Sequence, residues 1–291
     1  MEIDIEQQRV QIIEKIIARQ DKQSRWAFDK DLARKRPELR HYLPKYSSTL
    51  WTMLYLAELK TPLAETRIQR SLDLLLDELY DKEHGIFDLG RIHFPVPCLS
   101  GNMLYLNFYF QRPCTEKISK VIDFFDAQQR FDDGDFKPPA KYPLHKSCYG
   151  KHTCIWGILN LARGLSFIPT RERTASAKRL LTRCIDFILL HEVCFRSHDK
   201  ERLIHPAMAI LTFPSMVGSD FLEILWILAR EGVKHPKTKR ALDMLKSKMT
   251  IDGSWNLEHA VSGLITSAGV KNRPNAFVTE RARQVLSKLA N

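Results

Sequence analysis

The sequence lacks the signals of a membrane-spanning or secreted chain. None of its apolar runs approaches the roughly 20 residues needed to span a bilayer. Its first ten residues are acidic and polar, whereas a signal peptide begins basic and continues apolar. Its 6 Cys residues are scattered over 291 positions, which is typical of reduced thiols rather than of a disulfide framework. We therefore expect a soluble globular protein of the cytoplasm.

Common catalytic signatures are missing as well. The chain has no glycine-rich phosphate loop, no His-Glu-x-x-His and no Gly-x-Ser-x-Gly, which argues against dinucleotide-binding, P-loop and hydrolase classes. The net charge of +11 fits an anionic partner or a membrane surface, and Arg34-Lys35-Arg36 is its densest run. The aromatic residues do not alternate with Lys and Arg as on a base-stacking platform, which argues against a nucleic acid partner.

Helical periodicity is the dominant pattern along the chain. Residues 3–19 place isoleucines at steps of three and four, which predicts an amphipathic helix. Strand-like alternation is nearly absent. We predict an all-α fold, with an N-terminal helical arm over residues 1–44 and a repeat domain over residues 45–291.

Internal repetition defines that repeat domain. An amphipathic segment recurs four times, each copy centred on an aspartate, and three copies end in Gly-x-aromatic 10 to 12 residues later. The four aspartates are Asp73, Asp123, Asp186 and Asp243, and the three endings are Gly85–Phe87, Gly134–Phe136 and Gly253–Trp255. A more apolar segment type lies between the copies, at residues 50–56, 101–106, 157–161 and 221–228, with a weaker fifth copy near Ser262. The alternation predicts helical hairpins stacked around a continuous core, either closed or as an open solenoid.

Two of these endings resemble a known motif. Gln128-Gln129 before Asp133-Gly134-Asp135-Phe136, and Lys248 before Asp252-Gly253-Ser254-Trp255, are similar to the QW motif of squalene cyclases. The β subunits of protein prenyltransferases use the same hairpin. In those families the hairpins close into a ring, an α/α toroid, whose inner helices line an apolar cavity. The resemblance covers about residues 45–290 and implies a toroid of about five hairpins, in which Gln128, Gln129, Asp133 and Asp252 are structural.

The chemistry of those families is only partly represented. Asp-x-Asp-Asp, the acid of class II cyclases, is absent, and so is the Asp-Asp-x-x-Asp of class I synthases. The acidic run Asp132–Asp135 lies on the repeat's turn rather than on an inner helix. A squalene cyclase proper is therefore not expected.

One polar cluster points to a metal. Cys148, His152 and Cys154 supply sulfur and imidazole ligands within seven residues, which suits a tetrahedral zinc ion. Positions 148 and 152 share a helix face, so a turn before Cys154 is needed to bring all three together. Cys98, one repeat earlier, or the carboxylate of Asp220 could complete the set. The alternative is that the cysteines only pack, since free cysteine usually behaves as a small hydrophobe.

Two toroid families bind zinc with similar elements. The stretch Lys151-His152-Thr153-Cys154 resembles one in prenyltransferase β subunits, which implies His152 and Cys98 as ligands, although the family's aspartate is Val96 here. Cys148-Tyr149-Gly150 resembles the Cys-Tyr-Gly element of lanthionine synthetase cyclases, whose Cys-His-Gly element is absent. In both families the zinc ion holds a substrate thiol as thiolate.

These elements lead to one interpretation and one alternative. The interpretation is a prenyltransferase-like or terpenoid cyclase-like toroid that binds an isoprenoid-like or other hydrophobic ligand and acts, if an enzyme, as a transferase or cyclase. Its candidate substrate-binding residues are Trp51, Asn102, Tyr105 and Trp156, its catalytic carboxylate is Asp220, and its metal ligands are Cys98, Cys148, His152 and Cys154. Aromatic residues at helical spacing are also typical of plain core. The alternative is a non-catalytic helical-repeat scaffold for an anionic or protein partner, and a peripheral membrane contact stays open.

Overall fold

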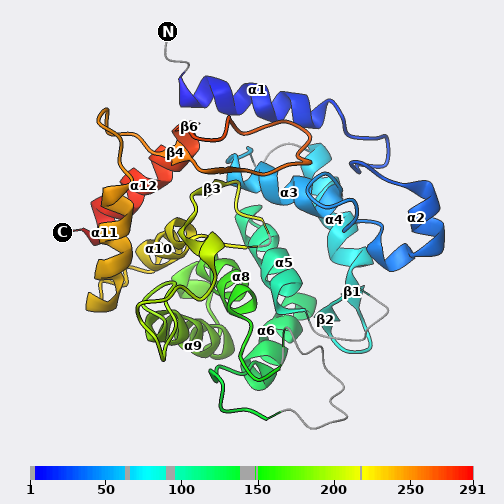
Figure 1. Cartoon of the computed structure of the whole chain (residues 1–291). Coiled ribbons are helices and arrows are strands. Elements are labelled where there is room, and N and C mark those ends of the chain that lie inside the picture. The colour runs from blue at the N-terminus through cyan, green and yellow to red at the C-terminus, as the bar shows by residue number, and fades with distance from the viewer. Residues whose placement is uncertain are drawn as a thin grey trace. The chain divides into compact units, whose positions relative to one another are not determined.

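The computed structural model describes residues 4–62, 66–89, 96–137, 148, 150–216 and 218–290. These residues are mainly α-helical, with strands of only two residues each (Figure 1). The mainly helical fold predicted from the periodicity is thereby confirmed. The chain divides into two compact units, residues 1–73 together with 192–291, and residues 74–191.

The first unit holds both ends of the chain. Its helices are α1 (Ile5–Ile17), α2 (Lys30–Lys35), α3 (Thr49–Glu58), α10 (Phe221–Arg230), α11 (Lys239–Ser247) and α12 (Ala276–Leu289). Its short 3-10 helices are η1 (Pro37–Leu39), η3 (Pro206–Ala209) and η4 (Pro236–Thr238). Its strand pairs are β3 (Thr212–Phe213) with β5 (His259–Ala260), in parallel, and β4 (Asn256–Leu257) with β6 (Arg273–Pro274), antiparallel.

The second unit is the middle of the chain. Its helices are α5 (Pro97–Tyr109), α6 (Glu116–Gln128), α8 (Ile155–Ser166), η2 (Thr170–Glu172) and α9 (Ala175–Leu190). The antiparallel strands β1 (Tyr80–Asp81) and β2 (Ile86–Phe87) precede them, and α4 (Thr66–Glu78) runs across the division between the units.

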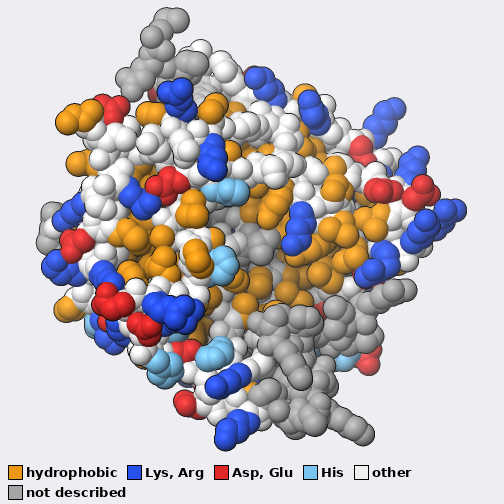
Figure 2. All heavy atoms as spheres, viewed as in Figure 1, with side chains coloured by type: hydrophobic (Ala, Val, Ile, Leu, Met, Phe, Trp, Pro, Cys, Tyr) orange, Lys and Arg blue, Asp and Glu red, His pale blue; other side chains and the backbone are white. Residues whose placement is uncertain are grey.

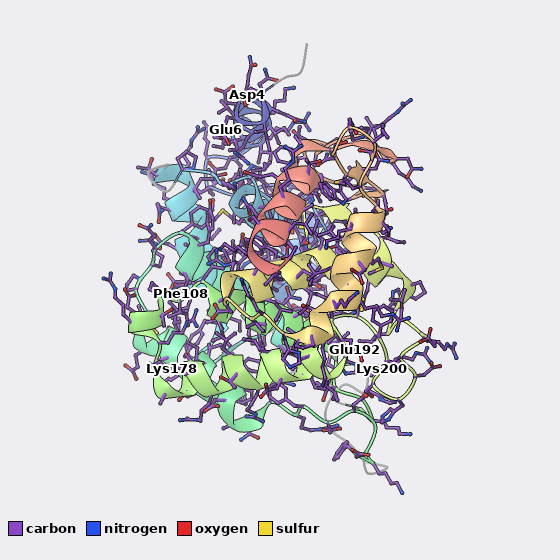
Figure 3. All side chains as sticks on the ribbon, turned by 90° about the vertical axis from the view of Figure 1, so that its left-hand side faces the viewer. Asp4, Glu6, Phe108, Lys178, Glu192 and Lys200 are labelled. Atoms are coloured by element: carbon purple, nitrogen blue, oxygen red, sulfur yellow. The ribbon has the colours of Figure 1, made fainter. Side chains whose placement is uncertain are left out.

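Side-chain capping explains where several helices begin. The Asp4 carboxylate accepts a hydrogen bond from the backbone N–H of Glu6 at the start of α1 (Figure 3). Thr115 and Thr174 cap α6 and α9 in the same way. These residues satisfy backbone donors that have no partner inside the helix.

The predicted alternation of helix types is present. The four aspartate-centred segments form α4, α6, α9 and α11, and the four apolar segments form α3, α5, α8 and α10. Every residue of α3 is buried, whereas α6 buries only Ile118, Val121, Ile122 and Phe125. The apolar helix α3 is thus buried on all sides, whereas the amphipathic helix α6 buries one face.

The fifth apolar copy predicted near Ser262 is wrong. Residues 261–272 form turns and bends, and the helix that follows is α12. Gly263 and Gly269 adopt positive φ angles of 83° and 154° in this stretch, and Pro274 ends it. These backbone conformations do not fit a helix.

The repeated Gly-x-aromatic ending has one backbone conformation. Gly85, Gly134 and Gly253 have φ angles of 69°, 104° and 73°, in the left-handed region that favours glycine. The aromatic residues Phe87 and Trp255, two positions later, are buried. The motif therefore turns the chain after an outer helix and anchors the turn with a ring.

The outer surface carries its charges in a dispersed pattern. On the face shown in Figure 2, Lys and Arg side chains are spread among apolar and acidic ones. Several basic residues are paired, as Lys200 is with Glu192 at 3.6 Å (Figure 3). Among the described helices, none is both long enough and apolar enough to cross a membrane.

Candidate functional site

The closest helix contact in the second unit lies between α5 and α8, and glycines permit it. A Cβ atom on Gly101 would lie 2.3 Å from the carbonyl carbon of Asn160. One on Gly164 would lie 2.6 Å from the carbonyl oxygen of Gly101, and one on Gly157 would lie 2.7 Å from Cγ of Pro97. The two backbones are therefore in direct contact, and the heads of the two helices meet.

This contact places two cysteines together. Cys98 lies in the first turn of α5, and Cys154 is the residue immediately before α8. Cys98 precedes Gly101 by three positions, and Cys154 precedes Gly157 by three. The two apolar segments thus begin with the same Cys-x-x-Gly pattern. Cys148 comes from the chain before α8, and its sulfur also contacts Cys154. We refer to these three thiols, in which Cys154 is hydrogen-bonded to each of the other two, as the cysteine cluster.

Hydrogen bonding within the cluster separates the thiols by acidity. Hydrogen bonds from Cys148 and Cys98 hold the pKa of the Cys154 thiol well below its usual range, although burial opposes this. The backbone N–H groups of Trp156 and Gly157, in the first turn of α8, favour the same thiolate. The hydrogen bond to Cys154, together with burial, raises the pKa of Cys98. Cys154 is therefore more acidic than Cys98.

His152 lies in a β-bridge with Asp133 rather than on a helix face shared with Cys148. Its Nδ1 lies 3.2 Å from Oδ1 of Asp133, on the turn after α6, and its side chain is 60% exposed. Nε2 of His191, a buried side chain at the end of α9, lies 3.9 Å from the other oxygen of Asp133. Asp133 thus lies between two imidazoles, a role that its assignment to a structural turn did not anticipate.

Hydrogen bonds also join the turn after α6 to residues 150–153, which precede Cys154. Arg130 donates to both carboxylate oxygens of Asp132 at 2.7 Å and to the carbonyl of Gly150 at 2.8 Å. The backbone N–H of Thr153 donates to the carbonyl of Asp132 at 3.2 Å. These bonds fix residues 150–153, just before Cys154. Ser147 and Tyr149, also part of the predicted cluster, lie outside the described residues.

The described residues contain no ready-made metal site. Nowhere among them do three or more His, Cys, Asp or Glu side chains form a group that could hold a metal ion. In the cluster the sulfurs are joined to one another by hydrogen bonds instead. The donor types are nevertheless those that zinc prefers.

Two of the predicted substrate-binding residues surround a buried arginine. Arg163 of α8 is 1% exposed and donates to the side-chain oxygens of Asn102 at 2.5 Å and Asn160 at 3.2 Å. Its guanidinium lies 4.5 Å from the centre of the Tyr105 ring. Trp156, half-buried, stands one turn before Asn160, whose amide donates to its carbonyl. Arg163 is the one charged residue of α8 and was not among the predicted site residues.

The remaining predicted site residues belong to the first unit. Trp51 is buried on α3, and its indole N–H donates to the carbonyl of Tyr42 at 2.7 Å. Asp220 is buried at the N-terminus of α10 and accepts hydrogen bonds from the backbone N–H groups of Glu223 and Thr212. Burial raises its pKa to about 7. The carboxyl that was predicted to be catalytic is therefore the N-cap of α10, and its oxygens accept backbone hydrogen bonds.

Comparison with known proteins gives no family for the chain. No protein-family model matches it, and no curated protein does. Among solved structures, the crystal structure of a protein from Actinoplanes aligns with 98% of this chain and 100% of its own, at 15% identity and a TM-score of 0.38. At this level of likeness neither a family nor a function is indicated.

Proposed function

We propose that this protein is an α/α toroid of the terpenoid cyclase and prenyltransferase kind, with a zinc site at the heads of its inner helices α5 and α8. The alternation of buried inner helices with amphipathic outer helices supports the toroid. The meeting of Cys98, Cys148 and Cys154 supports the metal, and it is the observation on which the proposal chiefly depends.

The thiol cluster suits zinc in donor type and in acidity. Two sulfurs on one tetrahedral zinc ion, each at about 2.3 Å, are about 3.8 Å apart, which is close to the separation of two thiols that share a proton. A metal bound by two of these thiols would take the place of the proton that they share. A cysteine binds zinc only as its thiolate. The low pKa of Cys154 therefore favours zinc binding at neutral pH.

His152 has the second contact that a zinc-binding histidine requires. Such a histidine usually donates its other ring N–H to a carboxylate, which fixes the tautomer and the ring orientation. Asp133 stands in this position at Nδ1 of His152, leaving Nε2 as the ligand nitrogen. Three protein thiolates leave the fourth position of the ion to His152 or to a substrate atom.

The chemistry that follows is thiol activation. Zinc, when bound, keeps a coordinated thiol deprotonated at neutral pH and thus nucleophilic. We propose a hydrophobic, isoprenoid-like ligand as the partner of that thiol, in a transfer reaction. Asn102, Tyr105 and Trp156 belong to the same two helices as the cluster, so a ligand at the helix heads would lie near their side of the unit.

Zinc content tests this proposal. Untagged protein is purified in buffer containing zinc, gel-filtered, and analysed by inductively coupled plasma mass spectrometry beside Cys98→Ser/Cys154→Ser and Cys114→Ser. Cys114 is an exposed cysteine of the same unit, so its variant is the matched control. We expect about one zinc per chain in the wild type and in Cys114→Ser, and loss of zinc from the double variant.

Cobalt substitution gives an independent measure. Cobalt bound by thiolates absorbs strongly in the near ultraviolet, and the band should vanish in the double variant while the helical circular dichroism stays unchanged. Zinc and cobalt bound equally by the double variant, or by neither protein, would refute the metal site. The chain would then fit the alternative of a binding scaffold, whose partner affinity should fall steeply with salt.

A further inference from the structure

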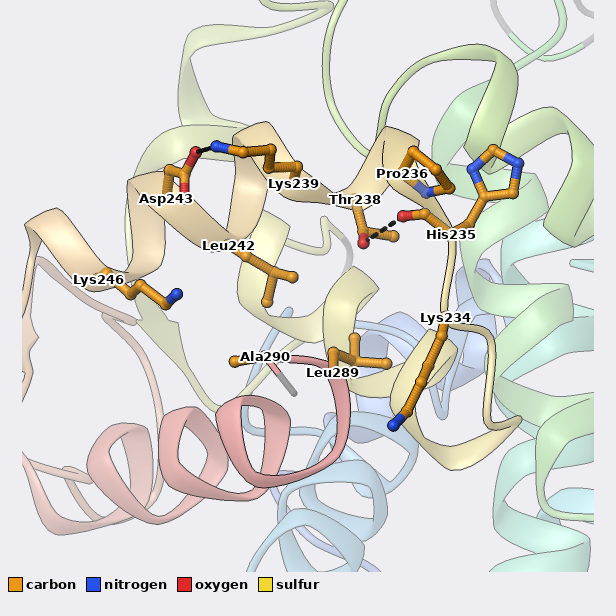
Figure 4. A pocket seen from close by; sticks show the side chains of 10 residues that line it. All are labelled: Lys234, His235, Pro236, Thr238, Lys239, Leu242, Asp243, Lys246, Leu289 and Ala290. Atoms are coloured by element: carbon orange, nitrogen blue, oxygen red, sulfur yellow. Dashed lines mark hydrogen bonds and ion pairs between the residues drawn. The ribbon is translucent and has the colours of Figure 1, made fainter.

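A pocket of about 350 Å³ lies in the first unit, far along the sequence from the cysteine cluster (Figure 4). It is formed by the chain around η4, one side of α11 and the last turn of α12. This volume is at the lower end of the range for small-molecule sites. The pocket therefore suits a compact ligand rather than a long lipid chain.

One wall of the pocket is apolar. Leu242 of α11 and Leu289 of α12 face each other across it in Figure 4, and only 7% and 8% of their surfaces are exposed. Pro236 and Ala290 extend this wall. A short aliphatic group in the pocket would be removed from water against these side chains.

The other wall is basic. Lys234, Lys239 and Lys246 line it, with Asp243 as the one acidic side chain among the lining residues. Lys239 is paired with Asp243 at 2.5 Å, and this hydrogen bond holds the pKa of that carboxyl low, so the two charges offset each other. Lys246 also helps to lower the pKa of Asp243, but neither it nor Lys234 makes an ion pair with any residue that the structure describes. Three lysines against one aspartate leave the lining with a net charge of +2 (3 − 1).

The polar groups beside the lysines are already satisfied. Nδ1 of His235 accepts the backbone N–H of Lys237 at 3.1 Å, and its carbonyl accepts the hydroxyl of Thr238 at 2.7 Å (Figure 4). These bonds form the 3-10 turn that presents Lys234 on one side of the pocket, while α11 presents Lys246 on another. The two free cations are thus carried on ordered backbone.

We propose that this pocket binds a soluble phosphate monoester with a short apolar body. The phosphate would lie between Lys234 and Lys246, and the body against Leu242 and Leu289. A phosphate monoester carries about −1.5 to −2 charges at neutral pH, which matches two free ammonium groups, whereas a carboxylate or a sulfate ester carries one. Lysines act on phosphate as point charges and need no fixed bidentate geometry.

Titration calorimetry with hexyl phosphate tests the proposal on the full-length protein. We expect Lys234→Ala and Lys246→Ala each to weaken binding about tenfold, since each removes one charge-assisted contact. Lys237→Ala is the matched control, because Lys237 is an exposed lysine of the same turn that does not line this pocket. Its affinity should stay within twofold of the wild type.

Three further comparisons separate the parts of the site. Hexyl sulfate should bind at least tenfold more weakly than hexyl phosphate, and hexanol should not bind measurably. Ala290→Trp places a bulky side chain on an exposed position of the apolar wall and should block hexyl phosphate with an unchanged circular dichroism spectrum. Sedimentation with phosphatidic acid vesicles separates a lipid headgroup from a soluble ester.

Each possible result of these experiments either supports or overturns the proposed phosphate site. Binding of hexyl phosphate that depends on both lysines and is blocked by Ala290→Trp supports the proposal. No binding, equal binding in the Lys234→Ala/Lys246→Ala double variant, or binding to the vesicles without binding of hexyl phosphate would overturn it. None of these results depends on the zinc proposal, because the pocket shares no residue with the cysteine cluster.

Discussion

Trp26 and Trp255 make two equivalent hydrogen bonds each, one through the indole and one through the backbone. The indole N–H of Trp26 donates to the carbonyl of Ile16 and that of Trp255 to the carbonyl of Leu245, each at 2.8 Å and each ten residues back along the chain. The backbone N–H of each tryptophan donates to a threonine hydroxyl in the first turn of a later helix, Thr49 of α3 at 3.3 Å and Thr279 of α12 at 3.0 Å. The two tryptophans therefore occupy equivalent positions in two hairpins.

This equivalence extends the repeat to the beginning of the described chain. Ser24, two residues before Trp26, has a φ angle of 60°, and Gly253, two residues before Trp255, has one of 73°. By this equivalence α1 corresponds to the amphipathic helix α11, and α3 to the helix α12 that follows Trp255.

Both indole bonds should contribute to stability. Trp26→Phe and Trp255→Phe each remove one hydrogen bond to a helix-end carbonyl, which keeps its backbone N–H donor. We expect each change to lower the free energy of unfolding by about 0.5–1.5 kcal/mol. Urea denaturation followed by circular dichroism measures this. Trp226→Phe is the comparison, since its indole is half-buried and bonds a side chain at 3.3 Å. Equal effects at all three positions would contradict the assignment.

The contact between α5 and α8 gives a steric prediction. In Gly101→Ala the new methyl group would overlap the backbone of Asn160, so the helices must separate, and we expect a loss of about 2 kcal/mol or more. The same change should separate Cys98 from Cys154 and lower zinc retention in the assay above.

Gly232→Ala provides the control for that variant. Gly232 has a positive φ of 67°, but nothing lies within 4 Å of the position of its Cβ. Only backbone strain of about 1 kcal/mol is expected there, and zinc retention should not change. A Gly101→Ala protein as stable as Gly232→Ala would show that the two backbones are not in contact.

The sequence predicted the hairpins and the cysteine cluster because both follow from short-range pattern. Apolar periodicity marks each helix, and the shared Cys-x-x-Gly opening places Cys98 and Cys154 at equivalent helix heads. Contacts between side chains far apart in the sequence could not be predicted, because they depend on how distant segments pack together. The contact of His152 with Asp133 is one such pairing, and the contact of Arg163 with Asn102 is another. The first hairpin was missed because Ser24 stands where the motif has glycine.

Asp220 should make stability depend on pH in the direction opposite to an ordinary ion pair. Burial raises its pKa in the folded protein to about 7, above an unfolded value of about 4. Between pH 4 and pH 7 Asp220 is protonated in the folded state and ionised in the unfolded state. The stability that this bound proton contributes is therefore complete below pH 4 and is lost as the pH rises to 7. Three pKa units correspond to at most about 4 kcal/mol.

Asp220→Asn isolates that slope. The variant cannot titrate, so its free energy of unfolding should vary less between pH 4 and pH 7 than that of the wild type, whatever its absolute stability. Urea midpoints at half-unit pH intervals measure the slope. Asp243→Asn, at an exposed carboxyl paired with Lys239, is the control and should leave the slope in this window unchanged. Parallel curves for wild type and Asp220→Asn would show that Asp220 is ionised throughout.

Asp133 provides the sharpest test of how the candidate zinc site is built. If Nδ1 of His152 is held by this carboxylate so that Nε2 can bind the metal, Asp133→Asn weakens the hold without removing a ligand, and we expect zinc affinity to fall about 10- to 100-fold. Competition with a chromophoric chelator measures the affinity. Asp135→Asn changes an exposed carboxyl on the same turn and should have no effect. Zinc affinity unchanged in Asp133→Asn but reduced in Cys98→Ser/Cys154→Ser would restrict the ligands to the thiols, and the contact between Asp133 and His152 would then only secure the turn after α6 to the chain before α8.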